Sequence, residues 1–359
     1  MTSKKRVVLF NTGNNVTNRM TVSGVEMMNI RGMLEAAGME VDLLSLKADD
    51  KLEVTAFDDS DVNDYDVVLT VASNLNFFGG VNNEGSQKAY ELMAKWPNDR
   101  PIYVALTDSN VKFTQYWDAV QGRGWNIHKN DVWVDNEIRV ISQNYNTSWV
   151  QDHQIGNFDR RKFVSFDWSK AFAHPYRFSE FADKINEDAD VDLIYGGSFR
   201  SGSRLRKMNE YLFDMPALAV EVFGSVKEAQ FEKFRTKYPY TVVPRFAKKL
   251  KTTEMVNNLS RSVATILIGD DAMNGVQPTA RVYEAYMSNA VAFIDHEFWM
   301  DEFAVHPFQL VTDKADLVNK ILFIKMNPVI RQQIVDKQHE FIRNIDWNGI
   351  YRTISNILQ

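Results

Sequence analysis

The chain has 359 residues, a formal net charge of −6 and no cysteine. Because single hydrophobic cores seldom grow beyond ~250–300 residues, this length predicts two domains. The lack of cysteine excludes disulfides, thiolate metal sites and cysteine nucleophiles, the six histidines show no metal-ligand spacing, and the acidic balance argues against coating of nucleic acid by bulk charge, though not against a local basic groove.

The chain begins with a strand instead of a signal peptide. The apolar run 6–11 follows directly on the first few residues, and no later run approaches the ~20 apolar residues of a membrane helix. We therefore expect a soluble, cytoplasmic protein that makes no contact with a membrane.

The first half of the sequence predicts a parallel α/β domain. Apolar runs of the kind buried in parallel sheets predict strands over 6–11, 40–46, 67–71, 102–106 and 138–142. Helical spacing of apolar residues occurs around 30–37 and 85–96.

Two segments that follow strands of this half hold candidate functional residues. Asp108 comes after the strand 102–106, and ligands of open α/β sheets bind beyond the carboxyl ends of strands, so a catalytic carboxylate fits this position. A helix cap or turn former is its alternative role. The loop 73–80 places Phe77 and Phe78 between an asparagine and two glycines, which is unusual loop chemistry.

Periodicity is lost between about 149 and 190, which predicts a domain boundary there. The second half then resumes the α/β pattern, with strands expected over 193–195, 219–223, 264–268 and 291–294, and helices near 228–234, 255–260 and 279–287. From 317 onward the sequence predicts helices, and the last segment, 347–358, is amphipathic.

Residues 193–208 have the pattern of a strand, a glycine turn and a helix. Gly196 and Gly197 allow a tight turn, and the free N–H groups of a helix start bind anions. Because Arg200 and Arg204 add two cations, phosphate is the expected ligand. The lysine of a Walker loop is missing, and no G-x-G-x-x-G follows a predicted strand, which disfavours an ATPase and nicotinamide or flavin chemistry. A surface turn with solvated arginines is the alternative.

A second pair of charges lies in the predicted helix 279–287. Arg281 and Glu284 are three residues apart and therefore share one helix face. A local ion pair is the simplest explanation of this spacing.

Six motifs occur along the chain in a fixed order. They are N-T-G-N-N-V at 11–16, D-V-N-D-Y-D at 61–66, N-F-F-G-G at 76–80, V-I-S-Q at 140–143, L-I-Y-G-G-S-F-R-S-G at 193–202 and R-V-Y-E at 281–284. In these motifs the chain resembles the DNA β-glucosyltransferase family of T-even bacteriophages, which glucosylates 5-hydroxymethylcytosine in duplex DNA. The resemblance covers most of the length.

The resemblance implies an α/β fold of two facing Rossmann-like domains, the glycosyltransferase B architecture. Its implied divisions are 1–175 for the acceptor DNA and the catalytic base, 176–340 for the UDP-sugar, and 341–359 for a C-terminal helix that returns to the first domain. A monomer that acts on duplex DNA containing 5-hydroxymethylcytosine, in an infected bacterial host, is expected.

The resemblance also assigns catalytic roles. Asp108 matches the general base, which takes the proton of the attacking hydroxymethyl group. Glu26 matches a glutamate that contacts the sugar, and Val22 lies in the same donor-binding segment. An exposed helix carboxylate is the alternative role for Glu26.

For the UDP-sugar, the resemblance implies a site in the second half. Arg200, Arg204 and Arg281 match the arginines that hold the diphosphate, and Glu284 matches the residue that binds the ribose hydroxyls. The remaining implied donor contacts are Gly197, Ser198, Phe223 and Gly224, of which the last two line the uracil pocket.

For the DNA, the target base must leave the stack, and Asn76 and Phe78 are implied as the element that probes the opened duplex. An interdomain packing contact is the alternative role of this loop. Lys248 and Lys249 are implied phosphate contacts. Transfer with the help of Mg²⁺ or Mn²⁺ and transfer without a metal both stay open.

The sequence departs from the family at 277–280 and matches it only in part over 100–145, which leaves the sugar open. The leading hypothesis is inverting transfer of glucose from UDP-glucose. The alternatives are UDP-arabinose as the donor, a non-catalytic protein that binds DNA or a sugar nucleotide, and transfer to a small molecule or a protein.

Overall fold

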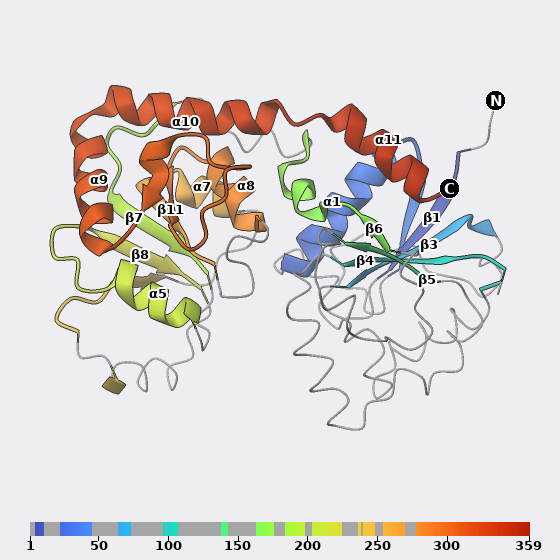
Figure 1. Cartoon of the computed structure of the whole chain (residues 1–359), viewed down its shortest axis with the longest axis horizontal. Coiled ribbons are helices and arrows are strands. Elements are labelled where there is room, and N and C mark those ends of the chain that lie inside the picture. The colour runs from blue at the N-terminus through green and yellow to red at the C-terminus, as the bar shows by residue number, and fades with distance from the viewer. Residues whose placement is uncertain are drawn as a thin grey trace. The chain divides into compact units, whose positions relative to one another are not determined.

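The computed structural model describes residues 4–10, 22–44, 64–72, 96–97, 99–106, 138–142, 163–175, 184–197, 203–224, 236–237, 240–247, 254–269 and 278–359. The chain divides into two compact units (Figure 1). The first consists of Met1–His174 together with Asp346–Gln359, and the second of Pro175–Ile345. The expected boundary after 340 falls inside a helix, and the chain leaves the second unit only after that helix ends.

The first unit contains a six-stranded parallel sheet in the order β2-β1-β3-β4-β5-β6. Its strands are β1 (Arg6–Phe10), β2 (Glu40–Leu44), β3 (Val67–Ala72), β4 (Ile102–Leu106), β5 (Ile138–Ser142) and β6 (Phe163–Ser165). Val7, Leu9 and Leu69 in the central strands are fully buried, as the apolar runs predict.

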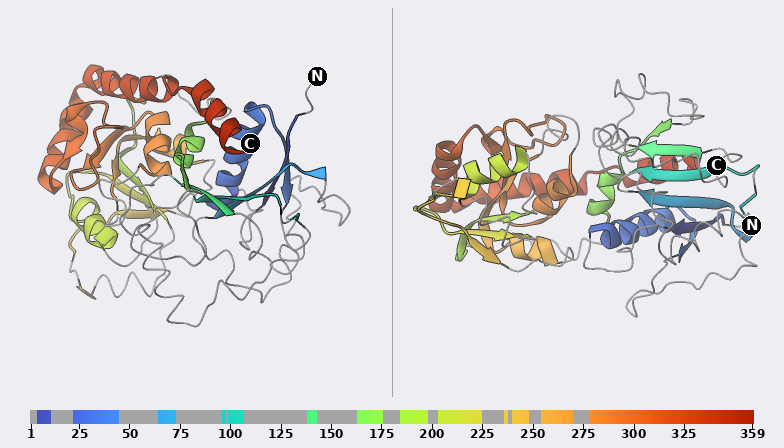
Figure 2. Two further views of the ribbon diagram at one scale, coloured as in Figure 1. Left: turned by 45° about the vertical axis from the view of Figure 1, so that its right-hand side comes forward. Right: turned by 90° about the horizontal axis from the view of Figure 1, so that it is seen from below.

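Three helical segments pack together in this unit: α1 (Val22–Ala36), the 3₁₀ helix η6 (Trp168–Ala173) and α11 (Trp347–Ile357) (Figures 1 and 2). After α1, Gly38 adopts φ +88°, a conformation that L side chains rarely adopt, so a glycine suits the end of this helix. In α11, Ile354 is 1% exposed and lies in the same core cluster as Ile30 and Trp168. The amphipathic face of α11 is thereby buried in the first unit.

His174, the last residue before the chain enters the second unit, predicts a pH dependence of stability. It is buried, and its Nε2 lies 3.0 Å from the Tyr351 hydroxyl of α11. Burial lowers the pKa of His174 from 6.5 to about 4. In the unfolded chain this histidine binds a proton near pH 6.5, whereas in the folded chain it stays neutral down to about pH 4. Its contribution to the free energy of unfolding is therefore fully present above pH 6.5 and is lost as the pH falls toward 4.

Between pH 7 and pH 5 this histidine should remove about 2 kcal/mol of the free energy of unfolding of the first unit. Urea unfolding of the wild type and of His174→Phe at both pH values measures the effect. The variant should lose less stability than the wild type over this interval. An equal loss in both proteins would contradict the role given to His174.

The second unit also contains a six-stranded parallel sheet, in the order β12-β11-β10-β7-β8-β9. Its strands are β7 (Val191–Gly196), β8 (Val220–Phe223), β9 (Arg245–Ala247), β10 (Ser262–Leu267), β11 (Val291–Asp295) and β12 (Leu310–Val311). Its helices are α5 (Ser203–Leu212), α7 (Met255–Leu259), α8 (Ala280–Met287), the 3₁₀ helix η9 (Pro307–Gln309), α9 (Lys314–Met326) and α10 (Pro328–Arg343).

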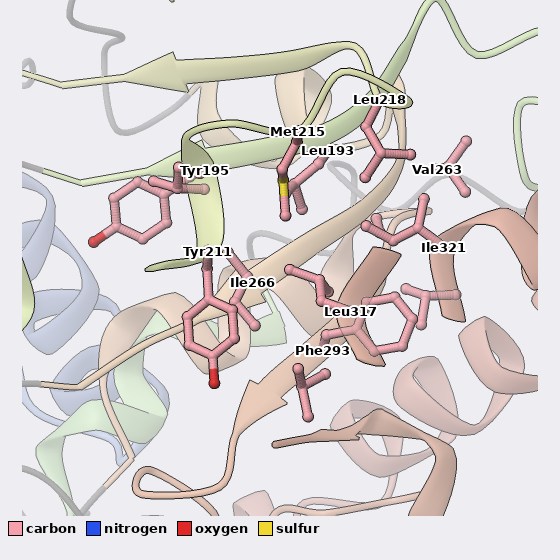
Figure 3. Close-up of a cluster of buried hydrophobic side chains, with 14 of the residues drawn as sticks. Leu193, Tyr195, Tyr211, Met215, Leu218, Val263, Ile266, Phe293, Leu317 and Ile321 are labelled. Atoms are coloured by element: carbon pink, nitrogen blue, oxygen red, sulfur yellow. The ribbon is translucent and has the colours of Figure 1, made fainter. Parts of the chain in front are cut away.

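Side chains alternate between the two faces of this sheet. Leu193 and Tyr195 of β7 point to the face covered by α5 and α9, where they meet Phe293 of β11 and Tyr211 of α5 (Figure 3). The labelled side chains of this core are Leu193, Tyr195, Tyr211, Met215, Leu218, Val263, Ile266, Phe293, Leu317 and Ile321. Gly196, the next residue of β7, faces the other side, where α7 and α8 lie.

The α/β prediction is confirmed, and the predicted strands that the structure describes coincide closely with the observed ones. Three short strands, β6, β9 and β12, escaped prediction because two or three residues are too few to show a period. β6 and η6 lie in the stretch where periodicity is lost, and they belong to the first unit. The helices predicted at 85–96 and 228–234 fall largely or wholly outside the described residues.

Candidate functional site

The second sheet reverses its direction of growth at β7. The chain adds β8 and β9 on one side of β7, and β10, β11 and β12 on the other. In doubly wound sheets, ligands bind at such a switch point, beyond the carboxyl ends of the two central strands. Those ends are occupied here by Gly196 and Gly197 of the β7 turn and by Ile268 and Gly269 after β10.

Gly196 and Gly197 are enclosed on both faces of the sheet. A Cβ on Gly197 would lie 2.5 Å from the Tyr195 hydroxyl oxygen, and a Cβ on Gly196 would lie 2.8 Å from Met255 Sδ. The Gly197 N–H donates to Phe223 O at 2.8 Å, which ties the end of β7 to the end of β8. The turn is therefore fixed in place with its backbone bare of side chains, as close approach of a ligand requires.

Arg281 of α8 lies against this turn. Its Cζ is 3.8 Å from the Cβ position of Gly196, although the two residues are far apart in the sequence. Its Nη1 also lies 2.5 Å from Glu284 Oε2, one turn along α8. The predicted ion pair is thus present, and it holds a guanidinium at the carboxyl end of β7.

Glu284 is more deeply buried than its partner. Its side chain is 1% exposed, compared with 32% for that of Arg281. The second oxygen, Oε1, is buried and accepts no hydrogen bond from the residues that the structure describes. A buried carboxylate oxygen without a donor is costly, so this atom indicates an acceptor that a bound hydroxyl or amide would satisfy.

Arg204 belongs to α5, which covers the opposite face of the sheet. It lies in the first turn of α5, the helix that follows the glycine turn, and its side chain is half-buried. Phe223 and Gly224 lie at the end of β8, beside β7, with Phe223 buried. The structure thus brings Gly197, Phe223 and Arg281 together, with Glu284 beside Arg281.

The other predicted site residues are not placed by these contacts. Val22 and Glu26 lie in α1, but their side chains are outside the described part of the structure. The predicted residues that fall outside the described residues altogether are Asn76, Phe78, Asp108, Ser198, Arg200, Lys248 and Lys249.

Tyr195 and Met255 are site residues that sequence reasoning missed. Both are apolar core residues by pattern, and only their distance to the two glycines reveals their role. The described residues contain no group of three histidine, aspartate or glutamate side chains that could hold a metal ion.

Comparison with known proteins assigns the chain to a family. A family model described as bacteriophage T4 beta-glucosyltransferase matches residues 5–160. The DNA beta-glucosyltransferase of Enterobacteria phage T4 is 31% identical over 357 residues, which are 97% of this chain and 98% of that protein. The chain belongs to the bacteriophage T4 β-glucosyltransferase family. The predicted resemblance is therefore confirmed.

Solved structures of this β-glucosyltransferase family share the fold. A mutant of phage T4 BGT in which an aspartate is replaced by alanine, in complex with UDP-glucose, superposes with a TM-score of 0.80, 31% identity and 99% coverage of both chains. Phage T4 BGT in complex with UDP and Mn²⁺ gives the same values. The predicted fold class, a two-domain α/β glycosyltransferase B fold, is confirmed, as is the class of enzyme, a glycosyltransferase.

In the described residues no helix is long and apolar enough to cross a membrane.

Proposed function

We propose that this β-glucosyltransferase family member transfers glucose from UDP-glucose to the hydroxymethyl group of 5-hydroxymethylcytosine in duplex DNA. The observation that carries the proposal is the Arg281–Glu284 pair, held against the bare glycine turn at the switch point of the second sheet. A cation beside a glycine turn that leads into a helix start suits a diphosphate, and a buried acceptor beside it suits a ribose hydroxyl. The relatives bound to UDP-glucose and to UDP support this choice of ligand.

In the proposed donor complex, the diphosphate lies on the Gly197–Ser198 backbone. Arg281 contacts it from the α8 face, and Arg200 and Arg204 from the α5 side. The bond from the anomeric carbon to the diphosphate oxygen breaks during transfer, which builds negative charge on UDP. Fixed guanidinium groups stabilise this charge more in the transition state than in the ground state. Ribose binds Glu284, and uracil lies at the Phe223–Gly224 strand end.

On the acceptor side, Asp108 accepts the hydroxyl proton as the hydroxymethyl oxygen attacks the anomeric carbon. The new glycosidic bond forms as the bond to UDP breaks, so a single displacement inverts the anomeric centre. Glu26, with Val22 in the same segment, contacts the sugar and keeps it oriented for this attack. Transfer with the help of Mg²⁺ or Mn²⁺ and transfer without a metal are both compatible with these roles, and a relative bound to UDP and Mn²⁺ supports the first.

For the DNA, the target base must leave the duplex to reach the sugar. Asn76 and Phe78 are proposed to occupy the opened stack, and Lys248 and Lys249 to contact phosphates. Because phosphate contacts release counterions, transfer should weaken steeply with rising salt if the acceptor is DNA.

Mass spectrometry of nucleosides tests the proposal. The protein is incubated with a duplex that contains 5-hydroxymethylcytosine, in separate reactions with UDP-glucose and UDP-arabinose, and a duplex with unmodified cytosine serves as the control. A hexose added only to hydroxymethylcytosine supports the proposal. A pentose on the same base would show that the donor is UDP-arabinose and not UDP-glucose. Failure with every UDP-sugar tested would overturn the proposed activity.

The glycine turn provides a matched pair of variants. In Gly197→Ala the new methyl group meets the ring and hydroxyl of the buried Tyr195, whereas in Gly196→Ala it meets the flexible end of Met255. We expect Gly197→Ala to weaken UDP binding at least about tenfold, because the clash with the buried Tyr195 ring displaces the turn, and Gly196→Ala to weaken it less. Calorimetric titration with UDP measures both, and equal affinities would contradict the placement of the diphosphate at Gly197.

A further inference from the structure

A cluster of charged side chains lies inside the second unit, on the sheet face covered by α5. Lys207 is 2% exposed, and its ammonium lies 3.0 Å from Asp295 Oδ1 and 2.9 Å from Glu297 Oε1. Tyr211, one turn further along α5, donates its hydroxyl to the same Asp295 oxygen at 2.8 Å. We call Lys207, Tyr211, Asp295 and Glu297 the Lys207 cluster.

The protonation states in the Lys207 cluster favour these contacts. Burial lowers the pKa of Lys207, but its hydrogen bonds to Glu297 and Asp295 raise it, and the net result is a raised pKa. Burial and the hydrogen bond to Asp295 both raise the pKa of Tyr211. At neutral pH the lysine is therefore charged and the tyrosine keeps its proton. Both groups can donate to the Asp295 carboxylate.

A buried ion pair usually stabilises a fold no more than well-packed apolar residues would. Its distinct property is direction, since an ammonium and a hydroxyl from α5 must both reach one oxygen at the end of β11. The Lys207 cluster therefore fixes the position of α5 along the strand direction. The apolar contacts of Met208 and Leu212 constrain this position less, because dispersion contacts have no preferred direction.

The sheet register shows which part of α5 is fixed. β10 pairs Leu267 with Ile294 and Thr265 with Ile194, so Asp295, after Ile294, is level with Gly197. Lys207 is anchored at this level, the level of the glycine turn. Arg204 lies three residues earlier on the same helix face, about 4.5 Å nearer the start of α5 and thus closer to the carboxyl edge of the sheet.

We propose that Lys207 is a positioning residue for the diphosphate: its contacts with Asp295 and Glu297 hold the first turn of α5 at the carboxyl edge of the sheet, where Arg204 and the start of the helix meet the ligand. This inference rests on the proposed UDP-glucose site. It assigns a binding function to a lysine that cannot itself touch the ligand from its buried position.

A double-mutant cycle tests the inference through the affinity for UDP, measured by calorimetry on the full chain. Lys207→Met should weaken UDP binding about tenfold in the wild-type background and less than about twofold in the Arg204→Ala background, because its effect passes through Arg204. Lys207→Arg, which keeps the charge, should restore most of the affinity. Equal weakening in both backgrounds would show a purely structural role and overturn the inference.

Two further variants make the test decisive. Arg206→Met is the matched control. Arg206 is a cation on the same helix and also contacts Glu297, at 3.4 Å, but its side chain is 55% exposed. The affinity of this variant for UDP should therefore equal that of the wild type.

If Lys207→Met does not fold, Tyr211→Phe takes its place, since it removes one hydrogen bond to Asp295 and leaves no charge unpaired. It should weaken UDP binding about twofold to threefold, again only when Arg204 is present.

The outcomes separate the two proposals. A wild-type protein that does not bind UDP would overturn both the proposed function and the positioning role. A wild-type protein that binds UDP, with unchanged affinity in folded Lys207→Met or folded Tyr211→Phe, would overturn the positioning role alone.

Discussion

Asp108→Ala should lower the rate of sugar transfer by about 10²–10⁴-fold while leaving the affinity for UDP within about threefold of wild type. The size of the loss is that of a general base, because a primary hydroxyl attacks slowly unless its proton is removed in the transition state. Asp108 follows the end of β4 in the first sheet, whereas the proposed diphosphate site is built by β7, α5 and α8 of the second. Its removal should therefore spare the donor site.

Single-turnover transfer to a hydroxymethylated duplex measures the rate, and calorimetry with UDP measures the affinity. Asp108→Asn is the shape-matched control, and it should be nearly as impaired as the alanine variant because an amide accepts no proton. A relative with alanine in place of one aspartate binds UDP-glucose, which is the behaviour expected here. Transfer at the wild-type rate would exclude Asp108 as the base, and a parallel loss of UDP binding would make it a donor-binding residue instead.

Glu284→Ala should weaken UDP binding by roughly 10–100-fold. Hydrogen bonds to a charged group contribute about 1.5–3 kcal/mol, and tenfold in affinity is about 1.4 kcal/mol. The variant removes the buried Oε1 acceptor and also the carboxylate that holds Arg281 Nη1 at 2.5 Å. Both the ribose contact and the orientation of the guanidinium should therefore be lost.

The ribose contact has a signature of its own. The wild type should bind UDP more tightly than 2′-deoxy-UDP, and Glu284→Ala should bind the two with nearly equal affinity, because the acceptor for the hydroxyl is gone. Glu302→Ala, which removes an exposed carboxylate of the same unit, is the control and should keep the preference. An undiminished preference for the ribonucleotide in Glu284→Ala would show that the ribose binds elsewhere.

Much of the fold was predictable because its signals are local. The central strands β1, β3, β7 and β10 are apolar runs bounded by polar residues or glycine, and Gly38 ends α1 with the positive φ that glycine tolerates. The edge strands β6, β9 and β12 were not predictable. They are short, and each forms backbone hydrogen bonds with a neighbouring strand on one side only. Their amino-acid composition therefore carries no clear signal of a strand.

The candidate site divides in the same way. Arg281 and Glu284 are three residues apart, so their pairing follows from helix geometry alone. Lys207 shows the opposite case. A lysine in a polar helix is expected to be solvated, yet this one is buried because it meets Asp295, which lies 88 residues later in the sequence.

Residues 193–208 therefore contain, in their own order, the strand, the bare turn, the helix start and the arginines that favour an anion, because backbone conformation and helix spacing depend on near neighbours. Which anion these residues bind depends on side chains from distant parts of the sequence, which a local pattern does not reveal. The parallel crossovers place β10 beside β7 and bring Arg281 to Gly196, while the pleat directs Asp295 toward α5. The fold decides these contacts because strand order and register are set by burial of the whole sheet, and a one-residue shift would turn each of these side chains to the opposite face.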